Sequence, residues 1–121
     1  MKKIVTIGEM KDISIQSSAY SSFHYKDLTG RSWLDDLNYW IKNADKIKKN
    51  LAKGDLSGID DLLTLILNVS YVLYSDGDQN NNLSFEEFLK RIDGMFDDSK
   101  WIDEVLTCAV SPFSRQLQAT K

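Results

Sequence analysis

The sequence predicts a small α+β protein that is mainly α, with a short N-terminal β-hairpin and about five helices around a central apolar helix. A length of 121 residues suits one domain with its own core. Two short alternating stretches open the chain, and apolar residues at helical spacing follow them. Residues 59–74 are apolar at nearly every position after Asp61, so this helix must lie centrally. We expect one domain over residues 1–112, with the hairpin in 1–16, and a polar tail over 113–121.

Composition and charge exclude several classes of protein. Charged residues make up 27% of the chain and apolar residues 42%, values typical of a folded protein rather than a disordered one. The net charge of -3 predicts no general attraction to nucleic acid or to an anionic membrane. The central helix is too short, and too often interrupted by polar residues, to span a membrane. The single cysteine, Cys108, cannot form an intramolecular disulfide, so we expect a cytoplasmic protein.

The first element should be a β-hairpin. Residues 4–7 and 12–16 alternate apolar and polar side chains on either side of a turn that begins at Gly8. This alternation places Ile13 and Ile15 on one face. A lone hairpin is only marginally stable, so helices must cover that face.

A first helix should follow the hairpin directly. Ser17 or Ser18 is placed to cap it, because a serine side chain can accept from the free N–H groups of a helix start. The helix should end at Gly30, which adopts the left-handed conformation without strain. Its apolar residues are Tyr20, Phe23 and Leu28.

The second helix should begin after Ser32 and carries the clearest apolar stripe of the chain. Its apolar residues recur at alternating spacings of four and three, and they are Trp33, Leu37, Trp40, Ala44, Ile47 and Leu51. Such a stripe faces either a core or a partner. Trp33 and Trp40 are candidate partner contacts, because interfaces favour large aromatic side chains. Burial of both in the core is the simpler interpretation, and we prefer it.

The same helix carries a basic patch. It consists of Lys42, Lys46, Lys48, Lys49 and Lys53. These lysines could contact phosphate or an acidic partner. Aspartates lie nearby at positions 35, 36 and 45, however, and mixed charges are typical of a solvated helix face. We therefore prefer the solvated face as the interpretation of this patch.

The middle of the chain has the order apolar helix, polar loop, helix. The apolar helix over 59–74 begins with Asp60 and Asp61, whose charges complement the helix dipole. It should stop at Ser75, where a run of turn-forming residues starts. Ser84 and Glu87 then have the spacing of a capping box, which starts the next helix.

A last helix should occupy the region before the tail. Asp98 or Ser99 is placed to cap it, and Pro112 should stop it. Its apolar residues are Trp101, Ile102, Val105, Leu106 and Ala109. Phe113 begins the polar tail and is the third candidate partner contact.

The loop over residues 76–87 resembles the calcium loop of an EF-hand, in which oxygen ligands come from alternate positions and from a final glutamate. If calcium binds, the resemblance implies that the ligands are Asp76, Asp78, Asn80, Asn82, Ser84 and Glu87. Asn81 stands where the sharp turn prefers glycine, and the sequence has no second loop of this kind. The capping box explains Ser84 and Glu87 without a metal. We therefore predict no metal and no other cofactor, with calcium as the alternative.

No set of residues predicts catalysis. His24 is the only histidine, and its place on a helix suggests a partly exposed structural role. Cys108 lies on an apolar helix, where cysteine is usually a small core residue. The paired aspartates at 35–36, 60–61 and 97–98 lie at or near expected helix starts, which is a sufficient reason for them. We therefore expect a protein that is not an enzyme.

Several features of the chain occur together in one known family. They are the strand at 13–16, the Ser-Ser-Ala helix start at 17–19, the Tyr-Lys pair at 25–26, and the Gly-Arg junction at 30–31 into a helix with aspartates. The apolar middle helix, the segment 84–89, the Trp101 helix and the polar tail follow in the same order. Together these features resemble the small tail assembly chaperones of long-tailed phages and prophages of Gram-positive bacteria.

This resemblance implies a non-enzymatic, self-associating protein that coats the tape measure protein before the tail tube polymerises, in the cytoplasm of the host bacterium. It also implies that a longer form can arise by ribosomal frameshifting near the end of the gene. A tape measure protein is a long helical chain with exposed apolar stripes, which suits helix-in-groove contacts. The predicted partners are the tape measure protein and further copies of this chain, with no nucleic acid and no membrane. The contact candidates are Trp33, Trp40 and Phe113.

Overall fold

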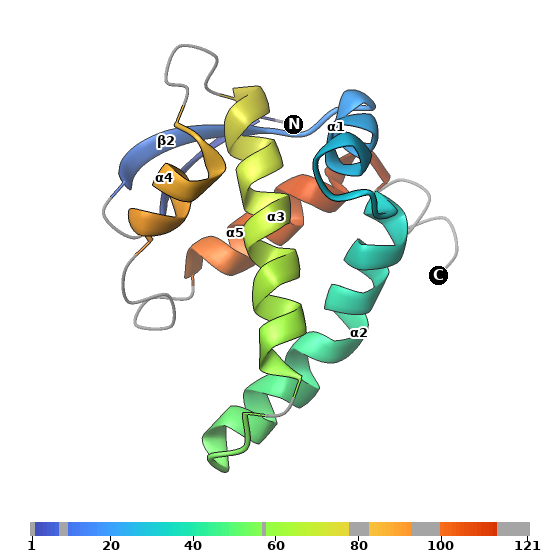
Figure 1. Ribbon diagram of the computed structural model, residues 1–121, viewed down its shortest axis with the longest axis vertical. Coiled ribbons are helices and arrows are strands. Elements are labelled where there is room, and N and C mark those ends of the chain that lie inside the picture. The colour runs from blue at the N-terminus through green and yellow to red at the C-terminus, as the bar shows by residue number, and fades with distance from the viewer. Residues whose placement is uncertain (1, 8–9, 57, 78–82, 93–99, 114–121) are drawn as a thin grey trace.

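The computed structural model describes residues 2–7, 10–56, 58–77, 83–92 and 100–113. In these ranges the chain forms two strands, five α-helices and one 3-10 turn, with both strands at the N-terminus. This arrangement confirms the predicted fold class. Figure 1 shows α3 running through the middle of the molecule, with α1 and α2 on one side and α4 on the other.

Strands β1 (Lys2–Ile7) and β2 (Met10–Gln16) form an antiparallel hairpin. The register pairs Lys3 with Ile15 and becomes irregular between Val5 and Ile7, where Asp12 adopts a left-handed φ of 55°. The covered face of the hairpin is buried, as the alternation predicted, and consists of Val5, Ile7, Met10, Ile13 and Ile15.

Helix α1 (Tyr20–Thr29) has different kinds of cap at its two ends. Its N-cap residue is Ala19, which makes no side-chain cap. Of the two predicted caps, the Ser18 hydroxyl accepts from the Tyr20 N–H at 3.2 Å, whereas Ser17 bonds the Cys108 carbonyl oxygen instead. Gly30 ends the helix with a left-handed φ of 73°, as predicted. The change of direction at this glycine leads the chain into α2.

Helices α2 (Trp33–Ala52) and α3 (Ile59–Gly77) form an antiparallel pair that extends below the rest of the molecule in Figure 1. Ser32 caps α2, because its hydroxyl oxygen accepts from the Asp35 N–H at 3.3 Å. The predicted stripe of α2 faces inward: Trp33, Leu37, Trp40 and Ile47 are buried, and Ala44 and Leu51 are partly buried against the core.

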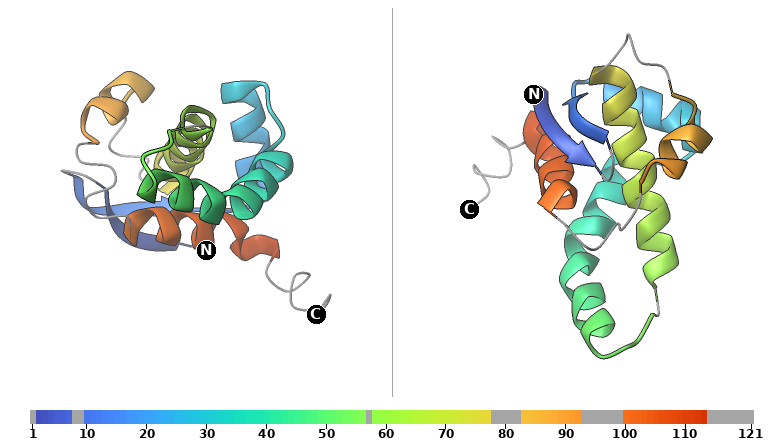
Figure 2. Two further views of the ribbon diagram at one scale, coloured as in Figure 1. Left: turned by 90° about the horizontal axis from the view of Figure 1, so that it is seen from below. Right: turned by 90° about the vertical axis from the view of Figure 1, so that its left-hand side faces the viewer.

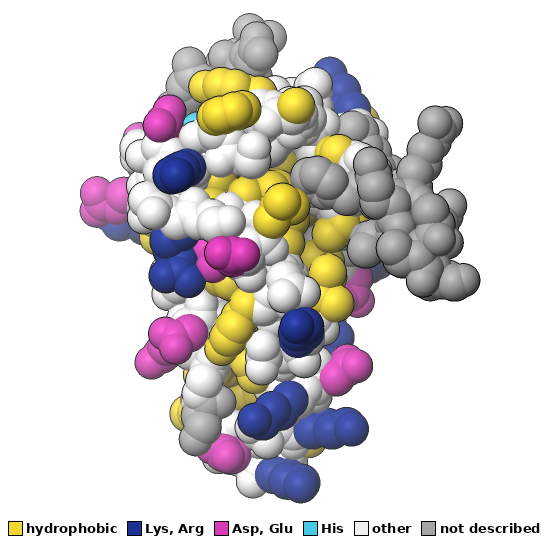
Figure 3. All heavy atoms as spheres, turned by 90° about the vertical axis from the view of Figure 1, so that its right-hand side faces the viewer, with side chains coloured by type: hydrophobic (Ala, Val, Ile, Leu, Met, Phe, Trp, Pro, Cys, Tyr) yellow, Lys and Arg dark blue, Asp and Glu magenta, His cyan; other side chains and the backbone are white. Residues whose placement is uncertain are grey.

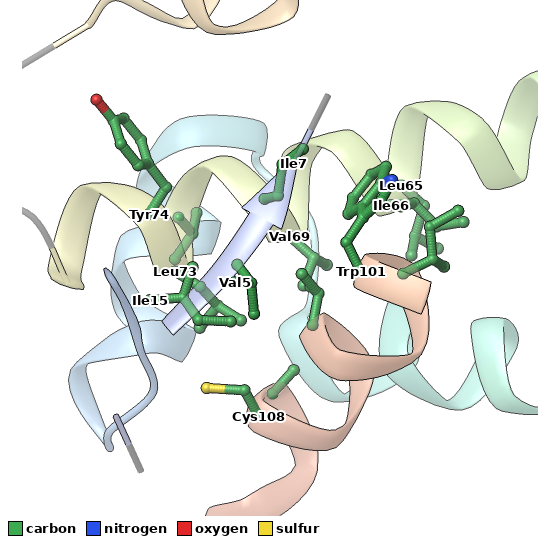
Figure 4. Packing of buried hydrophobic residues seen from close by; sticks show 14 of the residues in the cluster. Val5, Ile7, Ile15, Leu65, Ile66, Val69, Leu73, Tyr74, Trp101 and Cys108 are labelled. Atoms are coloured by element: carbon green, nitrogen blue, oxygen red, sulfur yellow. The ribbon is translucent and has the colours of Figure 1, made fainter. Parts of the chain in front are cut away.

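Helix α3 is the centre of the core, as its all-round apolar character predicted. It contacts β2, α1, α2, α4 and α5. Figure 4 shows its side chains meeting those of the hairpin and of α5. Its buried apolar residues are Leu62, Leu65, Ile66, Val69, Val72, Leu73 and Tyr74.

The end of α3 lies directly against the backbone of β2. The helix continues past Tyr74 to Gly77, so the predicted range 59–74 ends three residues too early. A β-carbon added at Gly77 would lie 2.4 Å from the Ser14 carbonyl oxygen and 2.7 Å from the Ile15 Cα. Only glycine allows a helix and a strand to approach this closely. The additional residues at the end of α3 therefore pack directly on the hairpin.

Helix α4 (Phe85–Lys90) starts at its predicted cap, and α5 (Lys100–Val110) continues into a 3-10 turn (Ser111–Phe113). The predicted caps of α5, Asp98 and Ser99, lie outside the described residues. Figure 2 shows α5 beside the hairpin, with both of them on one side of α3.

The end of the hairpin is joined to the last helix by a hydroxyl group. The Ser17 hydroxyl donates to the Cys108 carbonyl oxygen at 2.6 Å and lies 3.1 Å from the Ser111 hydroxyl. Cys108 itself is completely buried, which confirms its predicted place in the core. Among the helices in the described ranges, none has both the length and the apolar character that crossing a membrane requires.

Candidate protein-binding surface

An apolar groove opens between α2, α3 and the first turns of α5. Its volume is about 270 Å³, close to the lower end of the range for ligand pockets in proteins. Apolar side chains form nearly all of its lining, and Lys48 and Asp103 lie at its edge with their charged atoms 4.0 Å apart. The apolar lining residues are Trp40, Ala44, Ile47, Leu51, Ile59, Leu62, Leu63, Ile66, Ile102 and Leu106.

The lining has helical spacing on both long sides of the groove. On α2 the lining residues lie three or four positions apart along the stripe that faces α3. On α3, Ile59, Leu63 and Ile66 are spaced in the same way. Side chains at these spacings form ridges, and the groove between two such ridges is the shape into which a third helix packs.

Two of the three predicted contact residues, Trp33 and Trp40, do not lie on the surface. Trp33 is 3% exposed and Trp40 is 2% exposed, which confirms the core interpretation of the α2 stripe. Trp40 lines the groove, but its low exposure leaves little of its ring open to a ligand. Phe113 ends the 3-10 turn, and its side chain lies outside the described residues. The apolar residues that are exposed on the surface are different ones.

Exposed apolar side chains gather over α1 and α2. Tyr20 and Phe23 of α1 are 59% and 68% exposed, and Leu34 and Ile41 of α2 are 54% and 51% exposed. Figure 3 shows apolar side chains distributed over this face of the molecule. The sequence placed Tyr20 and Phe23 on a helix correctly, but its buried side consists of Ser21 and Tyr25 instead.

Tyr25 can be buried because the Asp36 carboxylate accepts a hydrogen bond from its hydroxyl group. The Tyr25 hydroxyl donates to Asp36 Oδ2 at 2.6 Å, and Arg31 donates to the same carboxylate through Nε at 2.9 Å and Nη2 at 2.8 Å. Asp36 is 3% exposed, so this network replaces its water shell. The network links α1, the Gly30 junction and α2. In the sequence, Asp36 has only the signature of a helix start, so its place in this network was not predictable from local pattern.

Burial and hydrogen bonding act in opposite directions on the pKa of Asp36. Burial alone would raise it, but the hydrogen bonds from Arg31 and Tyr25, and the charge of Arg31, outweigh burial and hold the pKa below its usual range. Burial and the neighbouring carboxylate raise the pKa of Tyr25. The carboxylate therefore stays ionised and the phenol stays protonated at neutral pH.

The loop that resembles a calcium site begins inside a helix. Asp76 belongs to α3, and its Oδ1 lies 2.8 Å from His24 Nδ1, a hydrogen bond between α1 and α3. Burial raises the pKa of Asp76, and the hydrogen bond from His24 lowers it in part. Asp76 Oδ2 is buried and has no hydrogen-bond partner among the described residues. The other proposed ligands Asp78, Asn80 and Asn82 lie outside the described residues.

Ser84 and Glu87 form the predicted cap of α4. The Ser84 hydroxyl oxygen lies 3.2 Å from the Glu87 N–H, which donates to it, and the hydroxyl donates to Glu87 Oε1 at 3.0 Å. The glutamate thus binds the serine side chain rather than its backbone N–H. In the part of the chain that the structure describes, no three His, Cys, Asp or Glu side chains are grouped as a metal would need.

We expect Ser84→Ala to lower the free energy of unfolding by about 1 kcal/mol, the usual cost of losing a serine cap. Because the cap requires no metal, the loss should be the same in calcium and in a chelator. Urea denaturation under both conditions measures this loss. Glu86→Ala, in the same turn of α4, is the control. A loss that appears only with calcium would contradict this assignment and support the metal site.

Comparison with known proteins identifies no relative of this chain. No protein-family model matches the sequence, and neither a curated protein nor a solved structure shows significant similarity to it. Any function must therefore be argued from the residues and their geometry.

Proposed function

We propose that this chain is a phage tail assembly chaperone that holds apolar helical segments of a tape measure protein in the groove between α2, α3 and α5. In this proposal the protein has no enzymatic activity, acts in the cytoplasm of the host bacterium and associates with further copies of itself. It shields the apolar stripes of its partner until the tail tube forms.

The groove is the observation that carries the proposal. It is apolar, open to solvent, and bordered by two helices whose side chains have the spacing of packing ridges. Ala44, Leu51, Ile59, Leu63 and Leu106 remain partly exposed along it. A partner helix that buried these side chains would remove apolar surface from water on both molecules, which stabilises the complex by roughly 25 cal/mol for each Å².

The proposal is tested by co-expression with the tape measure protein encoded in the same phage or prophage genome. The informative variant replaces Leu63 and Leu106 by glutamine, because both residues line the groove and neither is fully buried. We expect at least a tenfold loss of co-purified tape measure protein. Polar side chains in the groove would have to be desolvated without hydrogen-bond partners, which is unfavourable.

The matched control replaces Ile4 and Leu56 by glutamine. These two residues are 65% and 67% exposed and do not line the groove, so the control removes similar apolar side chains elsewhere. It should bind the tape measure protein like the wild type. Equal capture by all three proteins, at equal thermal stability, would defeat the proposal, as would failure of the wild type to bind.

A further inference from the structure

Helix α2 carries a row of lysines on the side opposite the groove. Its members are Lys42, Lys46 and Lys49 on the helix and Lys53 at its C-cap, and each follows a stripe residue by two positions. Two residues correspond to about 200° around a helix, so the row points away from the core. All four side chains are exposed. Figure 3 shows basic side chains gathered at the lower end of the molecule.

The acidic residues of α2 neutralise this row only in part. Asp36 is buried and bound by Arg31, and Asp35 lies in the first turn, where it complements the helix dipole. Asp45 follows Lys42 by three positions and precedes Lys49 by four, so it attracts both, but α2 carries no acidic residue after it. Among the ion pairs of the described residues, none involves the four lysines of the row.

Four like charges at these spacings disfavour the helix that carries them. Lysines three or four positions apart on a helix repel each other, whereas a glutamate at one of these positions would attract its neighbours. Solvated helix faces usually mix both signs. The protein has a net charge of -3, so the row is a local positive field on an acidic molecule. A partner with negative charges would offset the repulsion.

An apolar pair precedes the lysine row along α2. Leu34 and Ile41 are one heptad apart on α2, and both are about half exposed. They lie roughly 100° around the helix from the centre of the row. Both residues precede Lys42 in the chain, so a helix lying along this side of α2 would meet the apolar side chains first and the lysines after them, over a length of about 28 Å from Leu34 to Lys53.

We infer that this surface of α2 binds an acidic amphipathic helix of a partner protein. The lysine row pairs with carboxylates at matching helical spacing, and Leu34 and Ile41 pack against the apolar residues of the same partner helix. A protein partner is favoured over nucleic acid or an anionic membrane, because the net negative charge of the molecule repels extended polyanions. The surface is separate from the groove, so this inference does not depend on the proposed function.

The probe is a fluorescent helical peptide with glutamates at positions i, i+4, i+7 and i+11 and two leucines one heptad apart beyond one end of this run, where they can meet Leu34 and Ile41. Its counterpart has glutamine in place of each glutamate. Binding is measured by fluorescence anisotropy at low and at high salt. We expect saturable binding of the acidic peptide that weakens at least tenfold at high salt, and no binding of the counterpart.

Two variants with the same change of net charge distinguish the effect of the lysine row on binding from the effect of overall charge. The row variant replaces Lys42, Lys46, Lys49 and Lys53 by glutamine, and the control replaces Lys2, Lys11, Lys26 and Lys90, which are also exposed. The row variant should bind the acidic peptide at least tenfold more weakly. The control should remain within about twofold of the wild type, because screening limits the influence of distant charges.

A single substitution should separate binding from stability. Lys46→Glu places a carboxylate among Lys42, Lys49 and Lys53, so the melting temperature should rise while peptide affinity falls. If the lysine row had a purely structural role, this substitution would change only the melting temperature.

Several results would overturn the inference. They are absence of saturable peptide binding, equal losses in the row variant and its control, and tighter binding of the row to phosphatidylglycerol vesicles or duplex DNA than to the peptide. The groove variant should bind the peptide normally, so loss of tape measure capture with retained peptide binding would count against the proposed function alone.

Discussion

Gly77→Ala should lower the free energy of unfolding by about 3 kcal/mol or more, because the close contact between α3 and β2 leaves no space for a side chain. The added methyl group would lie within 2.8 Å of three backbone atoms of Ser14 and Ile15. Backbone atoms in a paired strand cannot move aside as a flexible side chain can. The hairpin and the end of α3 would have to separate, and both depend on each other for burial.

Urea denaturation measures this loss, with Gly54→Ala as the control. Gly54 has a left-handed φ of 80° and open space around its α-carbon, so alanine there meets backbone strain but no neighbouring atom. Strain of this kind costs about 1 kcal/mol. The two substitutions thus distinguish the cost of a steric clash from the cost of an unfavourable backbone conformation. A Gly77→Ala protein as stable as Gly54→Ala would contradict the close contact between α3 and β2.

Asp36→Ala should lower the free energy of unfolding by about 3 kcal/mol, a value typical of removing one partner from a buried charged pair. The Tyr25 hydroxyl would lose its 2.6 Å acceptor in a residue with no exposed surface. Arg31 would lose both of its hydrogen bonds to the carboxylate, although much of its side chain already contacts water. Most of the loss should therefore come from the tyrosine and from the space left beside it.

Asp35→Ala is the matched control. This neighbouring aspartate is exposed and its side chain contributes mainly through the helix dipole, so its loss should cost less than about 1 kcal/mol. Similar stability losses at positions 35 and 36 would contradict the assigned network.

The same network predicts a pH dependence. Because folding lowers the pKa of Asp36 below its usual range, the stability that its ionised form contributes is complete above the pKa of the unfolded chain. It is lost as the pH falls toward the folded-state pKa. Asp36→Ala should therefore have a flatter dependence of unfolding free energy on pH than the wild type below about pH 4, the usual range of an aspartate.

Elements with a strong repeating pattern were predictable. The stripe of α2 fixes which side of the helix faces inward, and the all-round apolar sequence of α3 fixes its central position. Ser32, Ser84 and Gly30 each act within one turn of the chain, so their local sequence was sufficient. Each of these features depends on neighbours that are close in sequence.

Features that depend on distant neighbours were not predictable. Gly77 has the appearance of a turn residue, and only the position of β2, more than sixty residues earlier, explains it. Asp36 lies where an aspartate suits a helix start, and its burial depends on Tyr25 and Arg31. The groove is formed by three helices, one of which is far away in the chain. Hydrophobic pattern alone does not specify how helices are arranged in space.

The apolar residues of α1 illustrate the same limit. Tyr20 and Phe23 would have occupied the inner face of a helix placed by hydrophobicity alone, yet both are exposed. The inner face carries Ser21, which accepts from the Ser18 N–H, and Tyr25, which reaches Asp36. Hydrogen bonds to fixed partners decided the rotation of this helix.

The hydroxyl of Ser17 and the carbonyl of Cys108 meet although 91 positions separate them in the chain. During synthesis the ribosome therefore releases the hairpin long before α3 and α5 exist to cover it. Its apolar face and its unpaired strand edges are open in the nascent chain, a state in which strands can pair with the wrong neighbour. The hairpin is therefore made before the helices that cover it, and it is enclosed only when α5 has been made.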